Sequence, residues 1–243
     1  GVAACVPRQV ARSADYPGLT PDERQRFIKT TGIEQRRVSA PDQCASDFCL
    51  AAAERLIADL QWAKQDIKLV VCITQSPDYP IPATGILLQQ RLGLGKDCLA
   101  FDVNLGCSGY VYGLLIAAST LHSLGRGKAL LLVGDTSTKS ANFRDRTVAP
   151  LFGDAGSATA LEYDPQAAPM TFDLNSDGSG WEAIVMRHGG FRHPISPDSL
   201  IEREVETGVF RTDANLELDG VEVFNFGLRA APETVTALLK AIP

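Results

Sequence analysis

The sequence predicts an α/β protein in which a mostly parallel sheet is covered by helices on both faces. Two observations carry this prediction. Short, near-continuous apolar runs alternate along the chain with longer segments whose apolar residues recur at helical spacing. The runs at 66–74, 99–105 and 129–134 are apolar at successive positions, which is typical of strands buried between two helical layers.

The composition excludes several classes of protein. The 243 residues are 45% hydrophobic, which is enough for the core of one large domain or two. No apolar stretch is long enough for a membrane helix, and no charged segment followed by an apolar run opens the sequence. A net charge of -6 disfavours a general affinity for nucleic acid or anionic membranes. We expect a soluble, cytoplasmic protein.

Cysteine and histidine spacing argues against a disulfide framework and against a metal site. None of the cysteines has CxxC spacing or a partnering histidine cluster, so we expect reduced thiols. The six cysteines are Cys5, Cys44, Cys49, Cys72, Cys98 and Cys107. His188 and His193 invite a metal hypothesis, but no third ligand has suitable spacing, and we expect no metal.

The first hundred residues contain two clear local signals. Thr20-Pro21-Asp22-Glu23 begins a helix, with a cap residue, a proline at the first helical position and acidic residues in the first turn. Three prolines within six residues exclude a helix or a central strand from 75–82, which we interpret as an ordered loop. The other elements expected here are strands at 1–7, 66–74 and 99–105, helices at 46–62 and 83–92, and a loop at 35–42.

The remainder continues the alternation and then becomes irregular. A glycine-containing stretch at 151–157 lacks the Gly-Lys-Ser/Thr ending of a phosphate-binding loop and does not fit GxGxxG. We expect a boundary near 165–168. The expected elements are helices at 108–124 and 222–242, the latter interrupted by Pro232, strands at 129–134, 158–163 and 170–180, a turn at 175–178, and loops at 144–150 and 188–220.

Cys107 is the strongest candidate for a catalytic residue. It lies where a buried strand is expected to turn sharply into a helix, and unpaired N–H groups at a helix N-terminus favour the reactive thiolate. The same strand-Gly-nucleophile-x-Gly-helix order is typical of serine α/β-hydrolases, so the turn predicts covalent catalysis without fixing the reaction. Free cysteines are often inert core residues, but this position favours a nucleophile.

The residues around Cys107 and several later motifs carry a family resemblance. Residues 102–110, Asp-Val-Asn-Leu-Gly-Cys-Ser-Gly-Tyr, are followed by Asp-Arg-Thr at 145–147 and Leu-Phe-Gly-Asp-Ala-Gly-Ser-Ala at 151–158. Further matches are at 31–33, 82–83, 176–178 and 220–224. In order and spacing the chain resembles β-ketoacyl-acyl carrier protein synthase III.

This resemblance implies the thiolase fold, with two similar halves in five αβαβα layers, and a homodimer. Residues 1–165 would form the N-terminal half that carries the nucleophile. Residues 166–243 would begin an incomplete C-terminal half, and we expect the sequence to be incomplete at both ends.

The resemblance also implies a reaction. Cys107 would take an acyl group from acyl-CoA, its own N–H would stabilise the tetrahedral intermediate, and the enolate from decarboxylated malonyl-acyl carrier protein would then attack the thioester. Acyl-CoA and acyl carrier protein are thus the implied partners, and no cofactor is expected. The family uses a His and an Asn at the decarboxylation step, which we expect beyond residue 243. His122, His188 and His193 do not match that motif, so we expect these 243 residues alone not to catalyse condensation.

Five further residues match substrate-binding positions of the family. Arg146 matches an arginine that contacts the adenine end of CoA, and Ile81 matches a residue that crosses the dimer interface to close the acyl pocket of the partner. Phe152, Gly220 and Phe224 match positions near the pocket and the pantetheine channel.

Two positions differ from the family pattern, and two alternative functions stay open. Arg26 and Thr30 stand where well-known members have a Trp and an Arg, which leaves open whether CoA or acyl carrier protein delivers the primer. A hydroxymethylglutaryl-CoA-synthase-like enzyme, or another thiolase-fold acyltransferase, would share the cysteine. A non-catalytic thiolase-fold subunit is the third reading, and the presence of Cys107 speaks against it.

Overall fold

The computed structural model describes residues 1–242 and forms two compact units. The first unit comprises residues 1–10, 37–136 and 153–168. The second comprises residues 11–36, 137–152 and the chain from residue 169 onward. These units follow from contacts between residues, so the proposed division into homologous halves at residue 165 stays a prediction.

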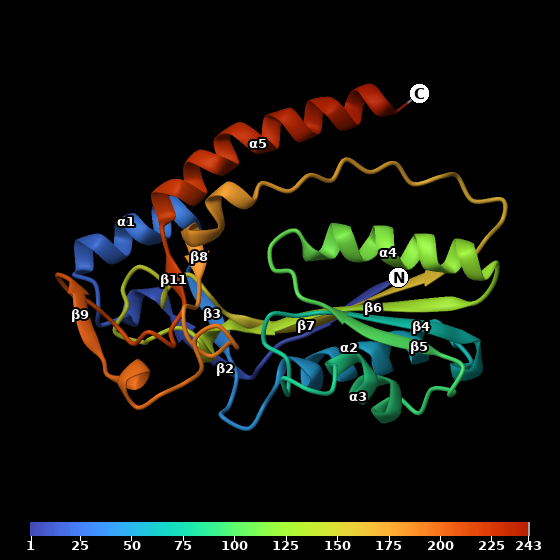
Figure 1. The fold of residues 1–243 in the computed structure, drawn as a ribbon, viewed down its shortest axis with the longest axis horizontal. Coiled ribbons are helices and arrows are strands. Elements are labelled where there is room, and N and C mark those ends of the chain that lie inside the picture. Colours follow the sequence, from blue (N-terminus) through green and yellow to red (C-terminus); the bar gives the residue numbers. More distant parts are fainter. Residues whose placement is uncertain (243) are drawn as a thin grey trace. The chain divides into compact units, whose positions relative to one another are not determined.

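A five-stranded sheet forms the centre of the first unit (Figure 1). Its strands, in spatial order, are β1 (Val2–Cys5), β7 (Asp154–Glu162), β6 (Lys128–Thr136), β4 (Ile67–Ile73) and β5 (Leu99–Val103). β4 pairs in parallel with β5 and β6, whereas β7 pairs antiparallel with both β6 and β1. The expectation of a mostly parallel sheet was wrong for this half of the sheet. No α-helix lies between β6 and β7, and a parallel pair would need such a crossover.

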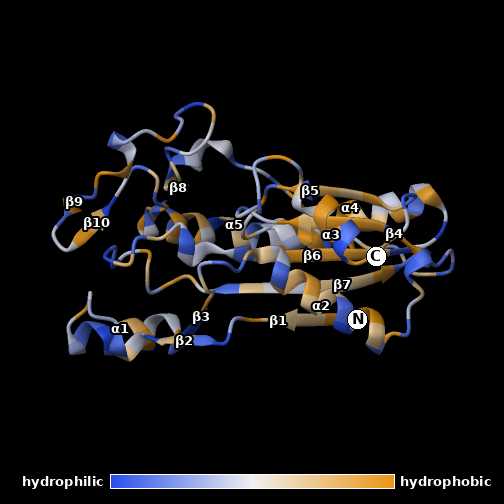
Figure 2. Ribbon diagram, turned by 90° about the horizontal axis from the view of Figure 1, so that it is seen from below, coloured by the Kyte–Doolittle hydropathy of each residue, from blue (hydrophilic) through white to orange (hydrophobic). Residues whose placement is uncertain are grey.

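Helices cover the two faces of this sheet. In Figure 1, α2 (Ala45–Asp59) and α3 (Thr84–Arg91) lie on one face and α4 (Gly109–Leu124) lies on the other. Val70 and Cys72 of β4 belong to the core cluster under α2 and α3, while alternate residues such as Val71 belong to the cluster under α4. Figure 2 shows the central strands mostly in hydrophobic colours. The prediction of strands buried on both faces is confirmed for β4 and β6, whereas β5 lies at the edge of the sheet and its residues are half-buried or exposed.

Two glycines let α4 pack very close to the sheet. A Cβ atom on Gly109 would lie 2.4 Å from Cγ2 of Ile73, and a Cβ atom on Gly113 would lie 2.5 Å from Cδ1 of Leu131. Both glycines are buried, and their spacing of four residues puts them on one face of the helix. The first turn of α4 is therefore held directly against the carboxyl end of β4.

Local sequence patterns were misleading at two strands. Residues 35–38 were expected to form a loop but form strand β3 (Gln35–Val38), which pairs with β2 (Gln9–Arg12) in a two-stranded sheet. This strand has no buried apolar face, so its sequence lacks the pattern by which a strand is predicted. Strand β7 begins at Asp154 and not at residue 158. Its Gly156 belongs to a packed strand, since a Cβ atom there would lie 2.4 Å from the backbone N of Cys49 in α2.

Three expectations for the C-terminal part were also wrong in detail. Residues 170–177 form no strand, and the 3-10 helix η4 (Gly178–Ala183) follows them. The irregular segment contains the short strands β9 (Arg203–Glu206), β10 (Val209–Arg211) and β11 (Glu217–Leu218). Helix α5 (Gly220–Ala241) continues through Pro232, because in a long helix one proline removes a single hydrogen bond and need not end it.

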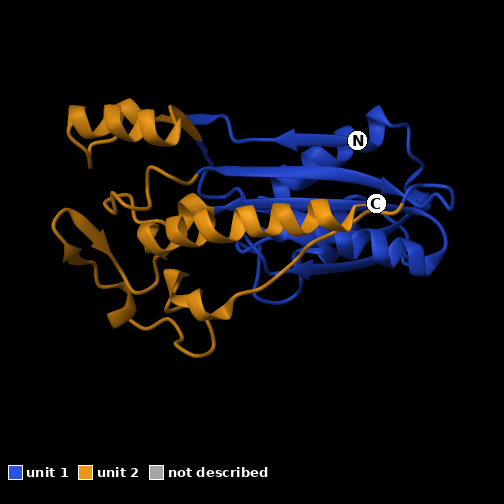
Figure 3. Cartoon of the chain, turned by 90° about the horizontal axis from the view of Figure 1, so that it is seen from above, with its two compact units in different colours: residues 1–10, 37–136, 153–168 blue, residues 11–36, 137–152, 169–243 orange. Residues whose placement is uncertain are grey.

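The second unit contains α1 (Pro21–Thr31), α5, the β9-β10 pair, and β11 paired with β8 (Ile184–Val185) (Figure 3). The predicted start of α1 is confirmed as a capping box. Thr20 N–H donates to Glu23 Oε2 at 2.8 Å, and Glu23 N–H donates to Thr20 Oγ1 at 3.4 Å. Gly32 ends the helix in the left-handed region at φ 72°. None of the helices within residues 1–242 combines the length and apolarity needed to span a membrane.

Asp102 joins two elements of the first unit. This residue of β5 accepts a hydrogen bond from Thr84 N–H at 2.6 Å and another from Gly85 N–H at 2.6 Å. Both donors belong to the first turn of α3, where no intrahelical partner is available, and both residues are buried.

We expect Asp102→Ala to destabilise the protein by about 2 kcal/mol, because two buried N–H groups lose their acceptor. Urea unfolding followed by circular dichroism measures the change. Asp59→Ala is the matched control, since Asp59 is exposed and forms an ion pair with Arg55 within α2. Equal unfolding midpoints for the two variants would contradict the role of Asp102.

Candidate active site at Cys107

Cys107 lies on the turn between β5 and α4, as the sequence predicts. β5 ends at Val103, Ser108 is the N-cap residue, and α4 begins at Gly109. The turn is closed by a hydrogen bond from Gly109 N–H to Gly106 O at 2.9 Å. The Cys107 residue is exposed, so a molecule in solution can reach it.

The backbone at this turn can stabilise a developing negative charge. Within residues 1–242 the structure shows no hydrogen bond from the N–H group of Cys107. This donor stands at the N-terminal end of the 16-residue helix α4, where the helix dipole also favours negative charge. An oxyanion formed on a carbonyl attacked by Cys107 would meet both features.

Three other thiols of the first unit are poor nucleophiles by comparison. Burial raises the pKa of Cys49 to about 12 and that of Cys98 to about 11, and it raises the pKa of Cys72 still further. These thiols are therefore protonated at neutral pH, and a protonated thiol does not attack a thioester. Cys107 is the exposed cysteine among the six.

Ile81 lies in the ordered loop that connects β4 to α3. Its side chain is 81% exposed, and the loop is tied at both ends by carboxylates. Asp102 binds the N–H groups at the start of α3, and Asp135, near the end of β6, accepts a hydrogen bond from Gln75 N–H at 2.7 Å. Sequence reasoning missed Gln75, Asp102 and Asp135. The available signal was an acidic residue within or at the end of a buried apolar strand, where an unpaired carboxylate is costly.

The other four predicted site residues lie in the second unit. Arg146 forms an ion pair with Glu23 of α1, with Nη1 and Oε1 3.4 Å apart. Phe152 is half-buried, while Phe224 of α5 is 64% exposed and Gly220 is the first residue of that helix. Their roles in substrate binding stay predictions.

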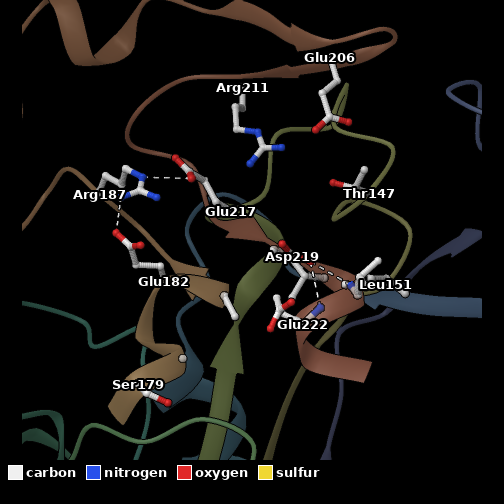
Figure 4. A pocket seen from close by; sticks show the side chains of 15 residues that line it. Thr147, Leu151, Ser179, Glu182, Arg187, Glu206, Arg211, Glu217, Asp219 and Glu222 are labelled. Atoms are coloured by element: carbon white, nitrogen blue, oxygen red, sulfur yellow. Dashed lines mark hydrogen bonds and ion pairs between the residues drawn. The ribbon is translucent and has the colours of Figure 1, made fainter. Parts of the chain in front are cut away.

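Gly220 lines a cavity of about 820 Å³ within the second unit (Figure 4). Its charged lining residues are Glu182, Arg187, Glu206, Arg211, Glu217, Asp219 and Glu222. Arg187 is neutralised by Glu217 at 3.1 Å and Glu182 at 3.6 Å, and Asp219 caps α5 through the N–H groups of Val221 and Glu222. With five carboxylates against two guanidinium groups, this cavity suits a neutral or cationic group better than a phosphate.

The structure assigns no catalytic or metal-binding role to the three histidines. His122 is in the last turn of α4, and a helix of 16 residues is about 24 Å long, so His122 lies far from Cys107. The rings of His188 and His193 stack with centroids 5.2 Å apart. In the part of the chain that the structure describes, no group of three or more His, Cys, Asp or Glu side chains is arranged to hold a metal ion.

Comparisons with known proteins identify a family. The family described as 3-oxoacyl-[acyl-carrier-protein (ACP)] synthase III matches residues 101–178, which include Cys107. A β-ketoacyl-[acyl-carrier-protein] synthase III of Desulfitobacterium hafniense is 32% identical over 243 residues, covering 100% of this chain and 70% of that protein. A 3-oxoacyl-[acyl-carrier-protein] synthase 3 of Campylobacter jejuni is 34% identical over 220 residues, but the match spans only 61% of its length.

Solved structures of this family have the same fold. A crystal structure of a 3-oxoacyl-(acyl-carrier-protein) synthase III matches with a TM-score of 0.92 and 36% identity, over 99% of this chain and 72% of that one. The enzyme from Burkholderia xenovorans LB400 matches with a TM-score of 0.88 and 33% identity, over 99% of this chain and 68% of that one. The predicted α/β thiolase-fold class is confirmed, and the chain belongs to the β-ketoacyl-acyl carrier protein synthase III family.

Proposed function

We propose that the protein containing this chain is a condensing acyltransferase that forms a β-ketoacyl-acyl carrier protein in fatty-acid or related acyl-chain synthesis. The observation that carries the proposal is the exposed Cys107 at the start of α4, with its own N–H group free to donate. Membership of the family supports the same reaction.

In the first half-reaction, Sγ of Cys107 attacks the carbonyl carbon of an acyl thioester. The new S–C bond forms, the bond to the donor sulfur breaks, and the donor leaves as a thiol carrying the proton that Cys107 gave up. The N–H group of Cys107 stabilises the tetrahedral oxyanion between these events. The cysteine is well suited to both roles, because nucleophile and donor belong to one residue on a turn held against the sheet.

In the second half-reaction, malonyl-acyl carrier protein loses carbon dioxide and its enolate carbon attacks the acyl group on Cys107. The Sγ–C bond breaks, Cys107 regains its thiol after protonation, and the product is two carbons longer. Acyl-CoA and acyl carrier protein are the partners of this proposal, a homodimer is the working assembly, and the cytoplasm is its location. We propose no cofactor beyond these substrates.

We expect acyl-CoA or acyl-carrier protein to place one acyl group on the intact protein, at Cys107. Its thiol is exposed, whereas burial keeps Cys49, Cys72 and Cys98 protonated. Mass spectrometry of digested protein after a short incubation locates the adduct. Cys107→Ser should lose the adduct and Cys98→Ser should keep it. An acyl group on Cys72 or Cys98 would show that the nucleophile is wrongly assigned.

We expect Ile81 to limit the length of the acyl chain. It matches the family residue that closes the acyl pocket of the partner subunit, and it lies on a loop that is restrained by prolines and by two carboxylates. One methylene too many in such a pocket costs about 1 to 3 kcal/mol. Ile81→Ala should therefore raise kcat/KM for longer primers relative to shorter ones about tenfold or more.

The matched control for this test is Ile86→Ala. Ile86 is also an exposed isoleucine and lies on the adjacent helix α3. Rates for a series of acyl-CoA primers should change with chain length in the Ile81 variant and stay parallel to wild type in the Ile86 variant. An unchanged chain-length profile for Ile81→Ala would mean that this side chain does not line the pocket.

A further inference from the structure

We propose that Asp135 and Gln75 are positioning residues for acyl transfer. Asp135 holds the first residues of the loop after β4, and the side chain of Gln75 braces the turn that carries Cys107. The inference rests on the proposed acyl transfer to Cys107, and it adds two residues that act through the cysteine turn.

Asp135 organises the start of the loop through a single oxygen atom. Its Oδ1 accepts hydrogen bonds from Thr74 Oγ1 at 3.1 Å, Gln75 N–H at 2.7 Å and Ser76 Oγ at 3.0 Å. Ser76 Oγ in turn accepts from Thr136 N–H at 2.9 Å. Hydrogen bonds to a carboxylate are stronger than those between neutral groups. The loop is thereby fixed to the end of β6.

Gln75 then connects this fixed loop to the cysteine turn. An ideal Cβ atom built on Gly106 would lie 2.4 Å from Gln75 Oε1 and 3.3 Å from its Cδ. The amide group of Gln75 therefore occupies the space beside the Gly106 Cα atom, one residue before Cys107. Gly106 is not in the left-handed region of backbone conformation, so its lack of a side chain serves this close approach.

The consequence concerns the direction of the Cys107 N–H group. Acyl transfer needs this donor aimed at the oxyanion, and a displacement of about 1 Å in such a site can cost about a hundredfold in rate. Alkylation of the same thiol by iodoacetamide forms no oxyanion. A brace that orients the turn should affect acyl transfer much more than alkylation.

The first experiment compares these two reactions in the intact protein. Gln75→Ala and Asp135→Ala should each slow acylation of Cys107 by acyl-CoA or acyl-carrier protein about tenfold to a hundredfold, with iodoacetamide labelling within about twofold of wild type. Asp135→Asn keeps a carbonyl acceptor at the same place and should recover most of the acylation rate. Asp59→Ala, which removes an exposed carboxylate from α2, is the control and should leave both rates unchanged.

The second experiment tests the contact itself by a double-mutant cycle. Gly106→Ala should push the Gln75 amide away and slow acylation as Gln75→Ala does. In the Gln75→Ala background the same change should add little further loss, because the contact is already gone. Losses that multiply in the double variant would show that the two residues act independently, and the proposal would fail.

The remaining outcomes separate this inference from the proposed function. If wild type is acylated at Cys107 and the variants are acylated equally fast, the positioning role is wrong and the acyl transfer stands. If acylation and alkylation fall together, the variants alter the thiol or the fold, which also overturns the inference. If wild type takes no acyl group at Cys107, the proposed function itself fails.

Discussion

The close packing of α4 against the central strands is the constraint on which the candidate site depends. Gly109 and Gly113 leave no room for any side chain between the helix and residues Ile73 and Leu131. A packed interior has few alternative arrangements, so the first turn of the helix has little freedom to move. Cys107 sits immediately before that turn, and its exposed thiol is thus presented by a rigid part of an otherwise apolar structure.

Carboxylates near the ends of two strands accept backbone hydrogen bonds that apolar packing cannot satisfy. The two strands that flank β4 each supply one carboxylate. Asp135 of β6 accepts from the first residues of the loop between β4 and α3, and Asp102 of β5 accepts from the first turn of α3. These hydrogen bonds also stabilise the carboxylates themselves, because a buried acidic group without hydrogen-bond partners is costly. The same hydrogen bonds therefore stabilise the loop and fix its position beside the cysteine turn.

The second unit differs in its physical character. Its cavity is lined by five carboxylates and two guanidinium groups, and its long helix α5 has no buried residue. The carboxylates of the cavity favour a neutral or cationic group.

Most helices and the buried strands could be predicted from the sequence, because each carries a local signal. The capping box at Thr20, the apolar runs of β4 and β6, and the strand-turn-helix pattern around Cys107 all depend on neighbouring residues only. β3 and the early start of β7 could not be predicted in this way. Their residues are polar or small, and they become strands because of a partner strand or a helix that lies far away in the sequence.

The same distinction holds for the candidate site. The amino-acid sequence by itself determined the position of Cys107 on a turn between a strand and a helix, because the patterns on both sides of it depend on neighbouring residues. Only the tertiary structure decided which residues lie around the cysteine turn and restrain the neighbouring loop. Gln75, Asp102 and Asp135 are separated along the chain, and they lie near the carboxyl ends of three strands because β4, β5 and β6 run in parallel. That direction of pairing is a property of the whole sheet, and no local pattern contains it.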